Sequence, residues 1–78
     1  MSWEKCRNFG VVKINPVNNI IHLYHDMHTS KSINPPGWNP VVESANWQGN
    51  NLMVRLVDNH GQRRAFIYRD FHDFQEIL

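Results

Sequence analysis

The stretch LMVRLVDNHGQRRAFIYRDF, residues 52–71, places a polar turn sequence between two apolar segments. The segments LMVRLV and RAFIYRDF are rich in Val, Ile, Phe and Tyr, which are common in β-strands because they pack well on a pleated surface. Between them, DNHGQ supplies the Asp, Asn and Gly residues that accept the backbone angles of tight turns. Two such segments separated by a short turn are typical of a β-hairpin, so this stretch predicts one.

The same pattern continues toward the amino terminus. VVESANW, residues 41–47, is another strand-like segment, and the QGNN turn after it predicts a three-stranded antiparallel meander. Further upstream, FGVVKI (residues 9–14) and IIHLYHDMH (residues 20–28) are joined by PVNN, which predicts a second hairpin. TSKSINPPGWNP, residues 29–40, is too long and too rich in proline for a hairpin, so we expect an ordered surface loop there.

The carboxyl-terminal segment RDFHDFQEIL has a different periodicity. Phe71, Phe74 and Leu78 recur at helical spacing, and Asp70 is placed to cap the amino end of a helix. We expect one or two helical turns there, with both Phe rings sealing the core. The sequence therefore predicts a single mainly β domain over residues 1–78. It would be a small SH3-like barrel or a bent five-stranded antiparallel sheet, with a short C-terminal helical turn.

Composition indicates a folded protein without a strong overall electrostatic field. Eight Lys and Arg residues oppose seven Asp and Glu residues, so the surface as a whole does not attract nucleic acid or anionic lipid. The hydrophobic fraction of 41% is enough to form a core, and the apolar runs are far too short for a membrane span. The single cysteine, Cys6, cannot form an internal disulfide, which is typical of a reducing compartment. We therefore expect a cytoplasmic protein without a membrane segment.

The second half of the chain, residues 41–78, resembles the small KTSC-type domains. The resemblance consists of a V-x-S-A start, an L-x-V-x-L strand, an F-x-Y strand and a D-F step toward a short helix. The matching residues are Val42, Ser44, Ala45, Leu52, Val54, Leu56, Phe66, Tyr68, Asp70 and Phe71. The proline usual before that family's helix is absent, and Phe71 stands near its place. The resemblance implies a small β fold and an accessory protein, of phage origin or otherwise, that modulates a larger host machine without an established chemistry.

Three histidines at a spacing of three, His22, His25 and His28, are the nearest feature to a chemical motif. In a strand, His22 and His28 share one face with Tyr24 while His25 lies on the other, and in a helix the outer two diverge. Zinc requires three or four converging ligands, and no CxxC, HExxH or zinc-finger spacing is present. We interpret the segment as a strand with a polar face, and a metal site at the three histidines is the alternative.

No group of residues in the sequence points to catalysis. Cys6 has no oxyanion-type glycine loop beside it, so a nucleophilic role for its thiol has no support. Asp70 and Asp73 are interpreted as carboxylates that favour the start of a helix through its dipole, not as an acid and base pair. A chain of 78 residues also leaves no room for two lobes with a cleft between them. We therefore predict a non-enzymatic protein without a cofactor.

Binding of single-stranded nucleic acid is the first alternative function. Four arginines lie on or beside the last two predicted strands: Arg55, Arg63, Arg64 and Arg69. Together with Phe66 and Tyr68 they would form a basic groove in which bases stack on aromatic rings. Strand alternation, however, distributes these side chains over two faces, and nearby Asp and Glu residues reduce the local positive charge.

Protein binding is the function that the sequence favours. The candidate contact residues are four aromatic residues: Trp38, Tyr24, Trp47 and Trp3. Trp38 lies in NPPGWNP, where the prolines restrict the loop, so its ring would lose little entropy on docking. The alternatives are that Trp38 folds over the core as a lid and that Trp47 lies in the core. Unpaired strand edges also lead us to expect a homodimer as a second form of association.

Overall fold

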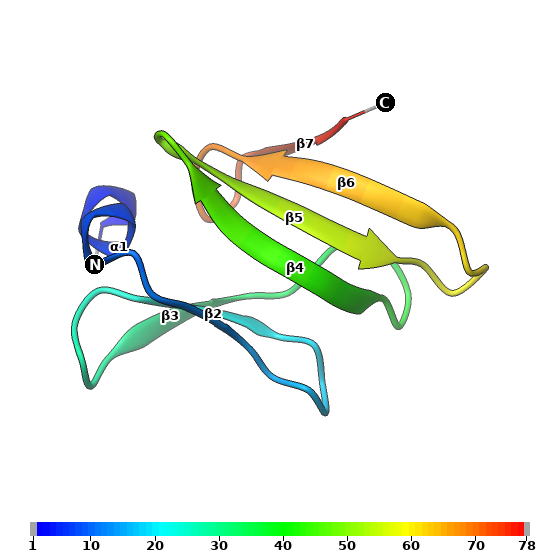
Figure 1. The fold of residues 1–78 in the computed structure, drawn as a ribbon, viewed down its shortest axis with the longest axis horizontal. Coiled ribbons are helices and arrows are strands. Elements are labelled where there is room, and N and C mark those ends of the chain that lie inside the picture. Colours follow the sequence, from blue (N-terminus) through cyan, green and yellow to red (C-terminus); the bar gives the residue numbers. More distant parts are fainter. Residues whose placement is uncertain (1, 78) are drawn as a thin grey trace.

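A computed structural model describes residues 2–77 and shows a mainly β protein with one short helix (Figure 1). In chain order the elements are α1 (Trp3–Phe9), β1 (Val12–Ile14), β2 (Ile21–Tyr24), β3 (Ser30–Ile33), β4 (Val41–Gln48), β5 (Asn51–Val57), β6 (Arg63–Tyr68) and β7 (Phe74–Ile77). The mainly β class that the abundance of Val, Ile and aromatic residues predicted is therefore confirmed.

The seven strands form two antiparallel sheets. The first sheet has the order β1-β2-β3 and the second the order β4-β5-β6-β7. The hairpin β5–β6, the meander β4–β5–β6 and the hairpin β1–β2 are all confirmed by the strand pairing. The two sheets form separate layers (Figure 1), and no strand pair within residues 2–77 joins them into one closed barrel.

The hydrophobic core lies between the two sheets. Alternate residues of β5 point inward, and Leu52 and Val54 are fully buried. Leu23 of β2 is fully buried in the opposing layer, and Phe71 from the turn after β6 is buried as predicted. Among residues 2–77, the buried core residues are Cys6, Ile21, Leu23, Ile33, Val42, Leu52, Val54, Leu56, Phe66, Tyr68 and Phe71. Burial of this apolar surface is the main force that holds the two sheets together.

A β-bulge in β4 decides which residues of that strand reach the core. Val42 faces inward, and strict alternation would place Ser44 on the same face. The register instead shifts between these two residues, because Glu43 is an extra residue in the strand. Ala45 and Trp47 consequently pack against the core while Glu43 is exposed.

The amino-terminal helix was not predicted. The side-chain oxygen of Ser2 accepts a hydrogen bond from the amide of Lys5 at 3.1 Å and caps the start of α1. The helix ends at Gly10, whose φ of 79° is the left-handed conformation typical of a helix end. On its inner face, α1 contributes Cys6 to the core.

The prediction of five strands and a C-terminal helical turn is wrong. β3 forms inside the segment expected to be a loop, because its backbone pairs with β2 along its whole length. At the carboxyl end, the amide of Arg69 donates to the carbonyl of Asp73 at 2.8 Å, and this turn reverses the chain so that β7 pairs with β6. Phe74 therefore lies on an edge strand and is 44% exposed, not a core residue. Leu78, the last residue of the predicted helix, lies outside the described residues.

The two sheets contact each other along β1 and β4. On this side, the amide of Val42 donates to Oδ1 of Asn19 at 2.9 Å, which fastens the turn between β1 and β2 to the start of β4. β3 and β7 are the outermost strands away from this contact, and each ends its sheet with an unpaired edge. The two sheets are thus in contact on the side of β1 and β4, while the outer edges of β3 and β7 are unpaired.

Candidate functional site

The loop between β3 and β4 presents Trp38 to solvent. Pro35 and Pro36 before the ring and Pro40 after it restrict the backbone, and Gly37 adopts a φ of 103° that few other residues accept. The Trp38 side chain is 73% exposed. Trp38 is therefore not a lid over the core, and it occupies the exposed position that a binding role requires.

Two aliphatic residues are exposed at the same end of the molecule. Val17 in the turn between β1 and β2 is 89% exposed, and Val41 at the start of β4 is 56% exposed. The amide of Val17 donates to Oδ1 of Asn15 at 2.8 Å, which fixes the conformation of the turn. The bond from Asn19 to the start of β4 then holds this turn beside the loop that carries Trp38.

We define the Trp38 surface as Val17, Trp38, Val41 and the hollow between the two loops. The hollow measures about 570 Å³ and is lined by Val17, Asn18, Asn19, Asn34, Pro35, Gly37, Trp38, Asn39 and Pro40. None of these residues is charged. The surface is therefore suited to apolar burial and to hydrogen bonds with side-chain amides, not to ion pairing. Val17 and Val41 were not singled out from the sequence, although an apolar residue inside the solvent-facing turn NPVNN was an available signal.

Trp3 and Trp47 lie elsewhere, in an aromatic cluster beneath α1. The Trp3 ring packs edge-on against Trp47, with centroids 5.0 Å apart, and against Phe71, with centroids 5.2 Å apart. Nε1 of Trp3 donates to the carbonyl oxygen of Asn50 at 2.8 Å. These contacts attach α1 to the β4–β5 turn and to the core, so both rings hold the fold together and neither belongs to the Trp38 surface.

Tyr24 lies on the outer face of the first sheet. Because Leu23 of β2 points into the core, its neighbours His22 and Tyr24 point away from it. The ammonium group of Lys13 lies 5.5 Å from the centroid of the Tyr24 ring. This half-buried tyrosine is therefore also separate from the Trp38 surface.

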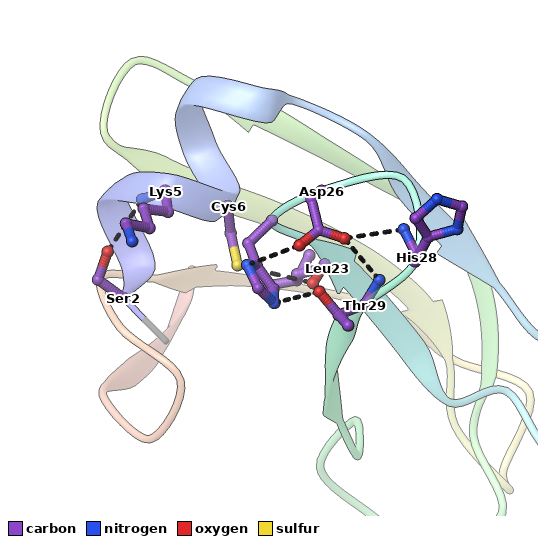
Figure 2. Close-up of polar contacts among 8 residues, drawn as sticks. Ser2, Lys5, Cys6, Leu23, Asp26, His28 and Thr29 are labelled. Atoms are coloured by element: carbon purple, nitrogen blue, oxygen red, sulfur yellow. Dashed lines mark hydrogen bonds and ion pairs between the residues drawn. The ribbon is translucent and has the colours of Figure 1, made fainter.

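The three histidines have different partners. Nδ1 of His22 lies 3.2 Å from Oγ of Ser32, whereas Nε2 of His25 lies 2.5 Å from Oγ1 of Thr29. His28 lies in the β2–β3 turn, where its amide donates to Oδ1 of Asp26 at 2.8 Å (Figure 2). Only the first of these histidines belongs to a strand, so the predicted strand over residues 20–28 is too long.

The β2–β3 turn is organised by the Asp26 carboxylate. The amides of His28 and Thr29 both donate to it, the latter at 2.9 Å (Figure 2), and these bonds lower the pKa of Asp26. Its role in the turn is thus local hydrogen bonding. Within residues 2–77, no three His, Cys, Asp or Glu side chains are grouped so that they could hold a metal ion.

The four arginines of the nucleic-acid alternative do not form a free basic groove. Three of them are paired with carboxylates: Arg63 with Glu43 (3.6 Å), Arg64 with Glu76 (2.8 Å) and Arg69 with Asp73 (3.7 Å). Arg55, Arg63 and Arg64 do line one pocket of about 360 Å³, but Glu43 and Glu76 line it too, and their carboxylates offset its positive charge. Phe66 and Tyr68 are 4% and 1% exposed, so neither ring is available to stack on a base.

Cys6 is a core residue of α1. Its Sγ lies 3.6 Å from the carbonyl oxygen of Leu23, and the side chain is fully buried (Figure 2). Burial raises the pKa of the thiol, so the nucleophilic thiolate form is disfavoured. The geometry therefore gives Cys6 a packing role.

Comparison with known proteins gives no match to any family model, curated protein or solved structure. The resemblance to KTSC-type domains therefore stays a prediction. In the part of the chain that the structure describes, no helix is long and apolar enough to cross a membrane.

Proposed function

We propose that this protein is a non-catalytic, cytoplasmic protein-binding domain that docks onto its partner through the Trp38 surface. The observation that carries the proposal is the 73% exposure of Trp38 on a loop bounded by prolines. A tryptophan ring buries a large area on docking, and a loop that is already restricted loses little conformational entropy. Residues of this kind supply much of the binding energy at protein interfaces.

The neighbourhood of Trp38 supports the same proposal. Single exposed apolar side chains are common on protein surfaces, whereas a contiguous group of them often marks an interaction site. Val17 and Val41 flank Trp38 at one end of the molecule, and the hollow between the loops offers asparagine amides around them. An apolar centre with a polar rim is the usual composition of a protein–protein interface.

A domain of this size acts by attachment to something larger, which is the accessory role that we propose for it. To identify that partner, the full chain and its Trp38→Ala variant are immobilised and exposed to cytoplasm, with and without nuclease treatment. A retained protein is then purified and titrated calorimetrically against both forms. We expect Trp38→Ala to weaken binding by about 2 kcal/mol or more, which is about thirtyfold in Kd.

Met27→Ala is the matched control. Met27 is also an exposed apolar residue in a turn, at 77% exposure, but it belongs to the β2–β3 turn and not to the Trp38 surface. We expect this variant to bind as the wild type does. Equal affinity of the wild type and Trp38→Ala would contradict the proposal, and retention that depends on nucleic acid would favour the alternative function.

A further inference from the structure

A second pocket lies between the end of β3 and the turn that joins β6 to β7, and the first residue of β7 also lines it. It measures about 210 Å³, and its apolar lining consists of Ile33, Tyr68, Phe71 and Phe74. That volume corresponds to several water molecules at about 30 Å³ each, so it has room for an apolar side chain. We call it the β3–β7 pocket.

On the free edge of β3, the backbone N–H and C=O groups of Ser30 and Ser32 point away from β2. Tyr24 of β2 donates its amide to the carbonyl of Val11, on the β1 side of the sheet, at 3.1 Å. In an antiparallel pair, a residue whose backbone points away from the neighbouring strand lies opposite a residue that also points away. Ser30 is paired with Tyr24, and Ser32 is paired with His22. His22 lies two residues before Tyr24 in β2, so its backbone groups point in the same direction as those of Tyr24. Both serines therefore offer their N–H and C=O groups to an additional strand.

The charges around this pocket are not balanced. The ammonium group of Lys31 lies 4.8 Å from the centroid of the Phe71 ring, and no carboxylate lies within 4 Å of it among residues 2–77. In the adjoining β6–β7 turn, the carboxylate of Asp70 accepts the amide of Phe71 at 2.7 Å, and that of Asp73 lies 3.7 Å from Arg69. The position next to the pocket is therefore complementary to an acidic group on a ligand.

The pocket is continuous with the Trp38 surface. Asn34, the residue after β3, lines both the β3–β7 pocket and the hollow beside Trp38. A chain that runs along the edge of β3 therefore reaches the loop that carries Trp38. One extended segment of a partner is long enough to contact both sites, because each residue of a strand spans about 3.3 Å.

We propose that the partner binds as an extended peptide that pairs with the free edge of β3, inserts one apolar side chain into the β3–β7 pocket and places a carboxylate beside Lys31. This inference rests on the proposed function and names the kind of segment that the domain recognises. Main-chain hydrogen bonds to Ser30 and Ser32 supply affinity, while the pocket and Lys31 select the side chains. The docked strand covers the unpaired edge of the first sheet.

The test uses a displayed library of random peptides of about twelve residues, which at about 3.3 Å per residue span β3 and the following loop. The immobilised full chain selects from this library, and enriched peptides are synthesised with a fluorescent label. Their Kd values are measured by fluorescence polarisation. Amide hydrogen exchange of the protein, followed by NMR, then compares Ser30 and Ser32 with and without peptide.

We expect enriched peptides to share an apolar and an acidic residue at a fixed spacing, and to protect the Ser30 and Ser32 amides from exchange. Lys31→Glu should weaken their binding by about tenfold or more, because it replaces attraction by repulsion of the carboxylate. Lys13→Glu is the matched control: it makes the same charge change on β1, at the other edge of the same sheet, and should leave the Kd unchanged.

Failure of this inference and failure of the proposed function give different results. Peptides that lose affinity in Trp38→Ala but leave the Ser30 and Ser32 amides unprotected would overturn strand pairing and keep the Trp38 surface. Peptides that protect both serines and bind equally to Trp38→Ala would keep strand pairing and remove the Trp38 surface from the site. A library that yields no enriched peptide would overturn the inference.

Discussion

Oδ1 of Asn19 accepts a hydrogen bond from the amide of Val42 at 2.9 Å, across the junction of the two sheets. Asn19 has a φ of 60°, a left-handed conformation that asparagine tolerates better than most residues. One side chain thus shapes the β1–β2 turn and fastens it to β4. Because Val17 lies in this turn and Val41 precedes the bonded amide, the same contact assembles the Trp38 surface.

Replacement of Asn19 should therefore reduce both stability and partner binding. Asn19→Gly retains the left-handed backbone but removes the acceptor, which leaves a partly buried amide of Val42 without its partner. We expect a loss of about 1–2 kcal/mol in the free energy of unfolding, measured by urea denaturation. Asn19→Asp keeps an acceptor oxygen and is the control. A glycine variant as stable as the wild type would show that the bond does not hold the sheets together.

Truncation to alanine should affect the stability of the fold much less at Trp38 than at Trp3. Trp38→Ala removes an exposed ring, so we expect a change in the free energy of unfolding within about 0.5 kcal/mol. Trp3→Ala removes a ring packed against Trp47 and Phe71, and should cost about 3 kcal/mol. Thermal and urea denaturation of the two variants measure the difference. A Trp38→Ala protein that fails to fold would remove Trp38 from the binding surface.

The meander could be predicted from the sequence because local signals agree there. β5 and β6 combine β-forming residues, inward alternation and a turn sequence, and each signal favours the same structure. The helix α1 was missed although its signals are local: Ser2 at the cap and Gly10 at the end bracket the segment. A stricter search for caps would have found it.

The edge strands β3 and β7 could not be predicted in this way, because their conformation depends on pairing with a neighbouring strand. β3 has the sequence SKSI, in which only Ile33 is buried, so its apolar pattern is too short to recognise. β7 contains the phenylalanine whose helical spacing from Phe71 favoured a helix, and the backbone of β6 overrides that preference. The pocket between the end of β3 and the β6–β7 turn could not be predicted for the same reason. The candidate site was predicted only in its central residue, Trp38, for which the sequence left exposure and burial as alternatives.

The ion pair of Arg64 and Glu76 should make the stability of the fold depend on pH in the acidic range. Arg64 donates to Oε2 of Glu76 at 2.8 Å, and this bond lowers the pKa of the carboxyl group in the folded protein. A group with a lowered folded pKa stabilises the fold above its unfolded pKa, about 4.3 for Glu, and that contribution disappears as the pH falls through the folded pKa. The free energy of unfolding should therefore decrease with acid below about pH 5.

Glu76→Gln tests this assignment. The glutamine still accepts a hydrogen bond but has no carboxyl group to titrate, so the variant should lose less stability between about pH 5 and pH 3 than the wild type. Urea denaturation at a series of pH values gives the two curves. Curves that remain parallel over this range would show that Arg64 does not perturb Glu76.

Tyr68 should make the stability of the fold decrease as the pH rises in the alkaline range. The side chain is 1% exposed, its hydroxyl has no hydrogen-bond partner within residues 2–77, and burial raises the pKa of Tyr68 to about 12. In the unfolded chain the phenol ionises near pH 10, so between about pH 10 and pH 12 the unfolded state releases a proton that the folded state retains. Stability that is present below about pH 10 is therefore lost as the pH rises through this window.

Tyr68→Phe removes the titrating hydroxyl and keeps the ring, which stacks on Phe74 with centroids 4.9 Å apart. At neutral pH, we expect the variant to be as stable as the wild type or more stable by up to about 1 kcal/mol, because the buried hydroxyl has lost its bond to water and gained none from the protein. Above about pH 10, the difference in favour of the variant should widen. Thermal denaturation from neutral to alkaline pH measures both effects. A variant that is less stable at neutral pH would mean that the hydroxyl forms a stabilising hydrogen bond in solution, and the buried phenol would then have a partner.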